Sequence, residues 1–440
     1  MTRPPAPRGA VRAVLAALAA ALLAVSVPIW AGTQGAGAPA QRRPAVPARP
    51  ATPAADRWAG SWAAAPAAAE PGTAHGYAGR SIRNVVHTTL AGSAARVQLS
   101  NLFGTTPLTI GHASLAVAAA PGSPAAVPGS VRALTFGGRT SVTIPAGRAA
   151  VSDPVRLAVG YPADLLVSTY SPSPSGPVTL HPHARQLSFL AAGDHTQDGD
   201  GSAYTVPTPF WRYVTAVDVR STEAQGAVVA LGDSITDGVS ATVGADRRWT
   251  DFLARRLHTE PGAPRYGVLN EGISGNRVLL GGMGASRVNN PSALERFDRD
   301  VLARAGVRAV VVELGVNDIL RRPRQTRPEA IVAGLQRLVD RAHAHGLRVV
   351  GATLSPFGGR VGTGPDQELV RQGVNDAIRT GLVFDDVVDF DVVLRDPADP
   401  QRLLPAYDCG DHLHPNDTGY LVMAKALDLA TLKGQGPARL

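Results

Sequence analysis

Cysteine is almost missing from this chain of 440 residues, because Cys409 is the only one. A single cysteine excludes an intramolecular disulfide, so the fold must be stabilised by core packing rather than by cross-links. Lysine is also scarce, with only Lys425 and Lys433. Beyond the amino terminus, no apolar run approaches the length that a membrane-spanning helix needs.

Acidic residues are absent from the first 50 residues, which contain six arginines. The whole chain has a net charge of +8, so removing these six charges leaves +2 for all other residues. The folded part is therefore close to neutral, and the charge predicts no nucleic-acid partner.

The amino terminus has the three-part layout of a secretory signal peptide. Three arginines precede an apolar run over residues 14–27, and small residues follow. The run is short for a spanning helix, so we expect residues 1–40 to be a cleaved signal peptide and the product to be secreted, with no stable membrane insertion after processing. An uncleaved anchor is the alternative. Residues 41–57 are rich in Ala, Pro and Arg and are expected to be a disordered linker.

Residues 58–222 have the pattern of β-strands. Apolar and polar residues alternate over residues 97–99, 142–144 and 217–219, and Gly- and Pro-containing turns recur between such stretches. The pattern predicts an amino-terminal domain with a β-sandwich or jelly-roll-like fold. Its aromatic residues Trp58, Trp62, Trp211 and Tyr213 are expected in the core, with a sugar-binding face as the alternative.

Residues 226–433 change to alternating strands and helices. The expected strands are 227–231, 267–270, 309–314, 348–353 and 387–390. The expected helices begin near Trp249, cover 292–305, follow a capping box of Thr326 and Glu329, and cover 366–379 and 416–432. Five strands that alternate with helices predict a parallel sheet with helices on both faces.

Ser234 is the candidate nucleophile. It follows the apolar run 228–231 in a Gly-Asp-Ser turn, which places it at the carboxyl end of a predicted buried strand. In an open parallel sheet, ligands bind at that end of the strands.

The candidate base lies near the carboxyl terminus, in Asp411-His412-Leu413-His414. Asp411 and His414 are three residues apart on a predicted tight turn, a spacing that lets the carboxylate fix the imidazole tautomer. His414 is favoured as the base, and His412 is the alternative.

Oxyanion donors are expected at two further strand ends. Gly275 lies in the segment after the second strand, where a glycine permits close backbone approach, and Asn317 follows the third strand with a side-chain amide that can donate. All of these candidates follow strands at one edge of one sheet.

This ordered set of motifs resembles the GDSL or SGNH hydrolase family. The matching segments are Gly232-Asp233-Ser234, Gly275 within Ile-Ser-Gly-Asn, Gly315-Val-Asn317-Asp318, and Asp411-x-x-His414. The resemblance implies a flavodoxin-like three-layer α/β/α fold with a five-stranded parallel sheet. It also implies a catalytic triad of Ser234, His414 and Asp411, and an oxyanion hole of Ser234, Gly275 and Asn317. No metal and no cofactor are implied.

The implied activity is hydrolysis of carboxylic esters through an acyl-enzyme. The chain is similar to a secreted bacterial branch of aryl esterases and acyl hydrolases, some associated with xylan degradation. The Gly-rich loop 279–285 and the lack of a long apolar lid favour short acyl groups. Deacetylation of plant-wall polysaccharide is one alternative, and a non-catalytic glycan-binding surface protein is another.

Other polar residues have structural interpretations. Asp233 and Asp318 are expected to bond loop backbone, whereas Asp237 is either close to the site or merely exposed. His343 and His345 lack an evident third metal ligand. Four carboxylates around the last strand are expected to be solvated, namely Asp385, Asp386, Asp389 and Asp391.

Overall fold

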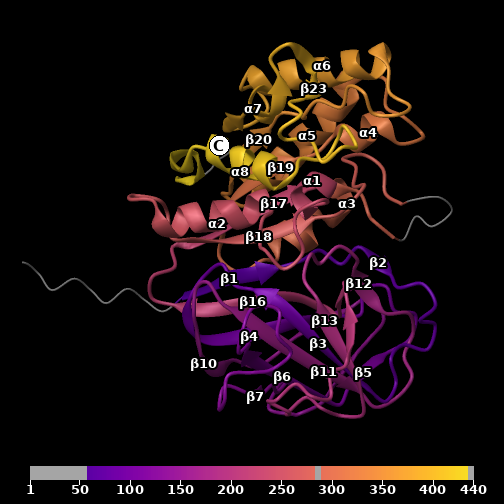
Figure 1. Ribbon diagram of the computed structural model, residues 1–440, viewed down its shortest axis with the longest axis vertical. Coiled ribbons are helices and arrows are strands. Elements are labelled where there is room, and N and C mark those ends of the chain that lie inside the picture. The colour runs from indigo at the N-terminus through magenta and orange to yellow at the C-terminus, as the bar shows by residue number, and fades with distance from the viewer. Residues whose placement is uncertain (1–56, 283–288, 435–440) are drawn as a thin grey trace, which may run out of the picture. The chain divides into compact units, whose positions relative to one another are not determined.

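The computed structural model describes residues 57–282 and 289–434. The predicted signal peptide, nearly all of the predicted linker and the end of the Gly-rich loop lie outside these residues. The amino-terminal half of the described chain consists of strands (Figure 1). The strands of its two larger sheets are β1 (Arg57–Ala63), β3 (Arg80–His87), β4 (Gly92–Ser100), β6 (His112–Val117), β7 (Arg132–Ala133), β9 (Ala149–Val151), β10 (Val155–Val159), β11 (Asp164–Ser171), β13 (Ser188–Ala192), β14 (Val206–Thr208) and β16 (Val214–Ser221).

Two antiparallel sheets dominate this β-rich region. One has the order β1-β16-β4-β10, with β9 also paired to β4, and the other has the order β14-β13-β3-β11-β6-β7. Smaller sheets join β2 (Ala68–Ala69), β12 (Thr179–His181) and β15 (Trp211–Arg212), and β5 (Leu108–Ile110) with β8 (Val142–Ile144). The three predicted stretches of alternation therefore lie in strands β4, β8 and β16.

Side chains of both large sheets contribute to one apolar core, for example Val97 of β4, Val217 of β16 and Val167 of β11. Trp62, Trp211 and Tyr213 are buried in the same core, as expected. The jelly-roll topology and the domain boundaries that the sequence suggested remain predictions.

The carboxyl-terminal half alternates strands and helices. Its strands are β17 (Gly226–Gly232), β18 (Tyr266–Gly272), β19 (Val307–Glu313), β20 (Arg348–Ala352), β21 (Asp386–Val388), β22 (Arg395–Asp396) and β23 (Asp399–Leu403). Its helices are α1 (Ser234–Asp237), α2 (Trp249–Thr259), α3 (Ala293–Phe297), the π-helical turn η1 (Asp298–Leu302), α4 (Val316–Leu320), α5 (Pro328–His343), α6 (Pro365–Arg379), α7 (Phe390–Leu394), α8 (Asp417–Ala426) and the 3₁₀ turn η2 (Leu429–Leu432).

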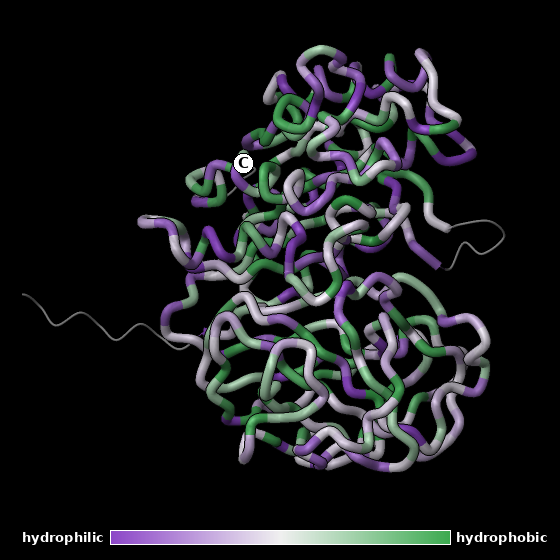
Figure 2. The backbone as a smooth tube through the Cα atoms, in the orientation of Figure 1, coloured by the Kyte–Doolittle hydropathy of each residue, from purple (hydrophilic) through white to green (hydrophobic). Residues whose placement is uncertain are grey.

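The predicted five-stranded parallel sheet is confirmed, in the order β18-β17-β19-β20-β21. Successive side chains of β17 enter two different cores, because neighbouring residues of a strand point to opposite faces. Val229 packs with the core that contains α5 and α6, whereas Val228 packs with the core that contains α2 and α8. The apolar strands run through the interior between these helices (Figure 2).

Several helix boundaries differ from the prediction. The capping box of Thr326 and Glu329 is wrong: α5 begins at Pro328 after Arg327, and no side chain caps it. Proline is favoured at the first helical position, because it lacks the N–H that would be unpaired there and its φ already suits the helix. The last predicted helix is also too long, since α8 ends at Ala426 and η2 follows.

The β-rich region covers the outer edge of β18. The Thr89 hydroxyl accepts a hydrogen bond from the backbone N–H of Val268 at 2.9 Å and donates to the backbone carbonyl of Ser61 at 2.5 Å. Strand β1 approaches so closely that a Cβ on Gly267 would lie 2.0 Å from the carbonyl oxygen of Gly60. Glycine is required at 267 for this contact.

Two of the four carboxylates near β21, Asp385 and Asp391, are buried, so the expectation that they are solvated is wrong, whereas Asp386 and Asp389 are partly exposed. Asp391 is fully buried and pairs with Arg371 at 2.6 Å and with Arg379 at 2.6 Å. Asp385 is also largely buried and accepts the backbone N–H of Val349. Among the described residues, no helix is long and apolar enough to cross a membrane.

Candidate active site

Ser234 stands at the carboxyl end of β17 and begins the short helix α1. The Asp233 carboxylate caps this helix by accepting the N–H of Ile235 at 3.0 Å. Ser234 is 7% exposed, so the turn holds this serine in place and still leaves part of it open to a ligand.

The predicted base and acid lie in hydrogen-bond contact with this serine. The His414 Nε2 atom is 2.8 Å from the Ser234 Oγ atom, and the His414 Nδ1 atom is 2.5 Å from the Asp411 Oδ2 atom. Because Asp411 can only accept there, Nδ1 carries the proton and Nε2 is left to accept from the serine hydroxyl.

The turn that carries Asp411 is stabilised by hydrogen bonds between its own residues. Its Oδ1 atom accepts the backbone N–H groups of Leu413 at 3.0 Å and His414 at 2.9 Å. Partial burial opposes ionisation, but these backbone bonds and the His414 ring outweigh it and lower the pKa of Asp411 to about 2. Asp411 therefore stays a carboxylate at any pH where the protein would work.

The alternative base, His412, points elsewhere. Its backbone has a φ of +60°, and its Nδ1 atom lies 2.6 Å from the Asp408 carboxylate. Cys409 between these turns is exposed.

Asn317 lies in α4, directly beside the nucleophile turn. Its Nδ2 atom donates to Asp233 at 3.1 Å, and its Oδ1 atom accepts from Arg321 at 3.0 Å. With the oxygen held by a guanidinium, the amide has a fixed orientation, and its second N–H remains to be directed at a ligand.

Gly275 adopts a φ of +79°, which side-chain-bearing residues rarely adopt. A Cβ there would lie 2.4 Å from an Nη atom of Arg321, so a larger residue would displace this guanidinium. In residues 57–282 and 289–434, neither the N–H of Gly275 nor that of Ser234 has a hydrogen-bond acceptor.

Three buried carboxyls surround these groups. Burial raises the pKa of Asp233 to about 7, and burial together with the Asp233 charge raises the pKa of Glu313 well above its ordinary value. Burial and the nearness of a second carboxyl group both disfavour the ionised form. Asp318 accepts the backbone N–H groups of Val278 and Leu279, so Asp233 and Asp318 bond loop backbone as expected.

Asp237, whose place the sequence left open, is buried and contacts a residue that the sequence did not single out. Its Oδ1 atom is 3.0 Å from the Nε2 atom of His181, which belongs to β12 of the β-rich region. Nothing in the local pattern around His181 marks it, because its partner lies 56 residues further along the chain.

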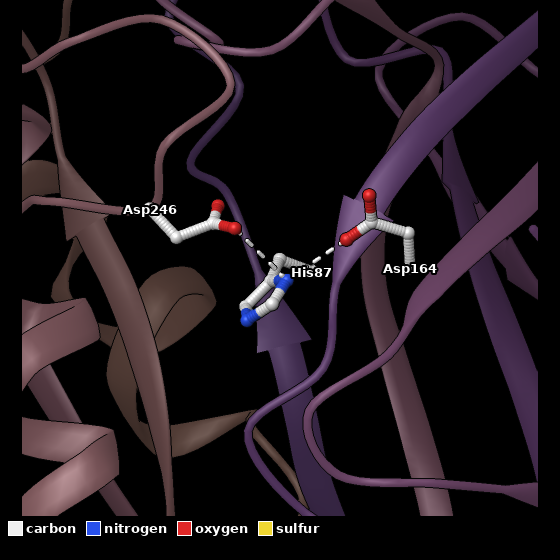
Figure 3. Close-up of side chains that lie close together, drawn as sticks. All are labelled: His87, Asp164 and Asp246. Carbon is white, nitrogen blue, oxygen red and sulfur yellow. Dashed lines mark hydrogen bonds and ion pairs between the residues drawn. The ribbon is translucent and has the colours of Figure 1, made fainter. Parts of the chain in front are cut away.

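A second cross-region group lies close to this pair. The His87 Nδ1 atom is 2.8 Å from Asp164 and 3.2 Å from Asp246, and Figure 3 shows the ring between the two carboxylates. Burial, the charge of Asp251 and that of Asp164 raise the pKa of Asp246 to about 6, against the opposing charge of His87. Burial lowers the pKa of His87, but Asp164, Asp246 and Asp251 reverse this, so the net shift is upward.

The His87 group and the group of Asp408, Cys409 and Asp411 each bring three potential ligand atoms together. The histidine and the carboxylates in these two groups already have hydrogen-bond partners in the protein. The expectation that the chain needs no metal and no cofactor remains a prediction.

Comparison with known proteins identifies the class to which this fold and site belong. Residues 230–422 match the family model described as the GDSL-like Lipase/Acylhydrolase family. The match covers the region that contains the parallel sheet and Ser234, and in this region the chain is similar to acylhydrolases and esterases. No curated protein matches the chain.

Solved structures similar to the chain include three esterases or lipases. A GDSL-like lipase from Bacteroides thetaiotaomicron VPI-5482 is 20% identical, with 47% of this chain and 87% of that chain covered and a TM-score of 0.35. A carbohydrate acetylesterase from Sinorhizobium meliloti is 18% identical, with coverages of 46% and 95% and a TM-score of 0.34. An acetylxylan esterase from Geobacillus stearothermophilus is 19% identical, with coverages of 49% and 97% and a TM-score of 0.36.

Proposed function

We propose that this chain is a secreted serine ester hydrolase that cleaves short-acyl carboxylic esters through an acyl-enzyme. Ser234 is the nucleophile, His414 the general base and acid, and Asp411 the carboxylate that orients His414. The backbone N–H groups of Ser234 and Gly275 and the side-chain amide of Asn317 stabilise the oxyanion.

One observation carries the proposal: the unbroken hydrogen-bond chain from Asp411 through His414 to Ser234. The nucleophile is within hydrogen-bond distance of its base, and the base is within hydrogen-bond distance of the group that orients it, which is the arrangement that activates a hydroxyl at neutral pH.

In the first half-reaction, the Ser234 Oγ atom attacks the ester carbonyl carbon while His414 Nε2 takes the hydroxyl proton. The carbonyl oxygen becomes negative and is held by the three N–H donors. The tetrahedral intermediate then collapses, the bond to the alcohol oxygen breaks, and His414 returns its proton to that oxygen. The alcohol leaves and the acyl group stays on Ser234.

In the second half-reaction, water takes the place of the alcohol. His414 removes a proton from water as it attacks the acyl carbon, the same donors hold the oxyanion, and the proton passes to Ser234 Oγ as the carboxylic acid leaves. No change of oxidation state occurs.

The test compares wild type and Ser234→Ala in the turnover of p-nitrophenyl acetate and butyrate, with intact mass after exposure to a fluorophosphonate. We expect turnover and a single covalent adduct in the wild type and neither in the variant. A Ser234→Ala protein that is as active as the wild type would overturn the proposal.

The natural ester is the next distinction. The loop that led us to favour short acyl groups is described up to Gly282, and its remaining residues lie outside the described part of the chain. Faster turnover of acetate than butyrate supports the short-acyl assignment, whereas release of acetate from acetylated xylan at a higher kcat/KM than from p-nitrophenyl acetate favours the polysaccharide esterase. Binding to a glycan array without hydrolysis of any ester favours the non-catalytic alternative.

Secretion is a proposal on the sequence of residues 1–57, which divide into a signal peptide to residue 40 and a linker. Expression of the full chain in a bacterial host, followed by intact mass of the protein in the medium, tests it. A product that lacks the apolar run of residues 14–27 supports cleavage, and a membrane-bound protein of full mass contradicts it.

A further inference from the structure

Asp237 connects the nucleophile turn to the segment that presents Gly275. Its Oδ2 atom accepts two hydrogen bonds from Ser274, one from the backbone N–H at 3.0 Å and one from the hydroxyl at 2.6 Å. Asp237 itself is the last residue of the helix that begins with Ser234. A single carboxylate therefore fixes Ser274, the residue immediately before Gly275, relative to the nucleophile.

The other oxygen of Asp237 is held by the β-rich region. The Nε2 atom of His181 lies 3.0 Å from Oδ1, and the Nδ1 atom of the same ring lies 2.9 Å from the carbonyl oxygen of Ala65. The Ala65 carbonyl can only accept, so Nδ1 carries a proton, and the opposite ring nitrogen faces the Asp237 carboxyl group.

The pair of His181 and Asp237 is shielded from solvent, with side-chain exposures of 5% for His181 and 1% for Asp237. The His181 ring also packs against Trp211, with ring centroids 5.4 Å apart. Loss of either side chain would strongly destabilise the fold, because it would leave a buried charge without its partner. The pair therefore holds one geometry.

Arg248 ties the same two segments together beside this pair. Its Nε atom donates to the backbone carbonyl of Asp237 at 2.9 Å, and its Nη2 atom donates to the carbonyl of Ala184, three residues after His181. The end of β12 and the residues after it thus contact the nucleophile turn through side chains from both regions.

We propose that His181 of the β-rich region is a positioning residue for ester hydrolysis: it orients Asp237, which holds Ser274 so that the backbone N–H of Gly275 points at the oxyanion. This inference rests on the proposed function, because it assigns Gly275 as a donor. The β-rich region is then part of the catalytic apparatus, not only a separate module.

The distinguishing property of such a residue is its effect on kcat. A misdirected Gly275 N–H weakens binding of the tetrahedral transition state and leaves binding of the ester ground state nearly unchanged. A contact that only fastens two regions together would instead change stability and leave the kcat of the folded protein intact.

The experiment measures kcat and KM for p-nitrophenyl acetate and the inhibition constant of an aryl trifluoromethyl ketone, which forms a tetrahedral oxyanion on a serine. We expect His181→Leu to lower kcat by about 10–100-fold, since a misplacement of about 1 Å is worth up to about 10²-fold. KM should change by less than about threefold, and the inhibitor should weaken by the same factor as kcat.

Conservative variants separate the hydrogen bond from the charge. His181→Gln should recover most of the lost kcat, because its Nε2 can donate to Asp237 from nearly the same place. If His181→Leu does not fold, His181→Leu/Asp237→Asn removes the unpaired buried charge and supplies the comparison, with Asp237→Asn alone as its reference. His343→Leu is the matched control, since His343 forms a similar pair with Asp385 at 3.1 Å away from the site.

Wild-type kcat and inhibitor affinity in folded His181→Leu would overturn the positioning role, as would an equal loss in His343→Leu. A failure of the proposed function looks different: Ser234→Ala, measured in the same assay, would then retain turnover. An inactive Ser234→Ala with a fully active His181→Leu contradicts the positioning role alone.

Discussion

The two sides of the active site are built in different ways. On the base side, Asp411 and His414 belong to one exposed turn in which the carboxylate accepts the backbone N–H of the residue that it orients. On the oxyanion side, Asn317 is fixed by Asp233 and Arg321, and the Gly275 segment is fixed by Asp237 and, through it, by His181.

This contrast separates local from long-range preorganisation. The base side needs only a short turn to place its groups, so its geometry tolerates changes elsewhere in the chain. The oxyanion side is buried and depends on contacts between segments that are far apart in the sequence, so changes at a distance can alter it.

The largest effect is expected on the base side. His414→Ala removes the group that deprotonates Ser234 and should lower kcat by about 10⁴-fold or more. His412→Ala is the matched control, two residues away, and should keep kcat within about threefold because that ring contacts Asp408 and not the serine. The measurement is turnover of p-nitrophenyl acetate. Equal losses in both variants would contradict the assignment of the base.

On the oxyanion side, Asn317→Ala should lower kcat by about 10²–10³-fold with little change in KM, because a donor to the transition state is lost and ground-state binding is not. It also leaves Asp233 without one of its hydrogen-bond donors. Steady-state kinetics on the acetate ester give both constants. A kcat near that of the wild type would remove Asn317 from the oxyanion hole.

A smaller effect concerns the boundary between the two regions. The pKa of Asp246 is raised to about 6, so between its ordinary pKa of 3.8 and about 6 the folded state binds a proton more tightly than the unfolded state. The free energy of unfolding therefore falls as pH rises through this window. His87, whose pKa is also raised, contributes stability that is lost as pH rises through its folded pKa.

Asp246→Asn should reduce the loss of unfolding free energy between pH 4 and pH 7 by about 2 kcal/mol, because position 246 no longer ionises. Urea unfolding at the two pH values measures it. Asp376→Asn, at a side chain 75% exposed, is the control and should leave the pH dependence as in the wild type. An unchanged pH dependence in Asp246→Asn would show that this carboxyl titrates alike in the folded and unfolded states.

The smallest effect is expected from chelation. Because both half-reactions use only Ser234, His414 and backbone or amide donors, EDTA should leave kcat unchanged within about twofold. A loss of activity that added Zn²⁺ or Mg²⁺ restores would contradict the prediction that no metal is needed. A rise in Tm with added metal would show that the folded protein binds the metal.

The sequence supported the strand and helix order of the carboxyl-terminal half, since its strands are short apolar runs and its helices are long and periodic. It also placed Ser234, Asp411 and His414 in segments that the structure brings into contact, because each segment follows a strand at one edge or forms a single turn. The roles of these residues await the kinetic tests.

Long-range pairings could not be predicted from local pattern. Asp391 was expected to be solvated, but its arginine partners come from α6, so a carboxylate that looks exposed in sequence is a buried ion pair in the fold. His181 has the same character, because only the packing of two regions brings it to Asp237. The start of α5 could have been predicted from local sequence, because Pro328 favours the first helical position. This preference outweighed the spacing of Thr326 and Glu329.

Because Thr89 and β1 cover the edge of β18, the two regions of this chain cannot be separated without exposing that edge. An uncovered outer strand offers a row of free backbone donors and acceptors to any other chain, and such an edge promotes aggregation. In this chain the outer strand of the parallel sheet is covered by the β-rich region, and Gly267 allows the backbone of β1 to approach it closely. We therefore expect residues 226–434, expressed alone, to expose the edge of β18 and to aggregate. Fusion of these residues to a different domain would require that domain to cover β18 and to replace the contact of His181 with Asp237.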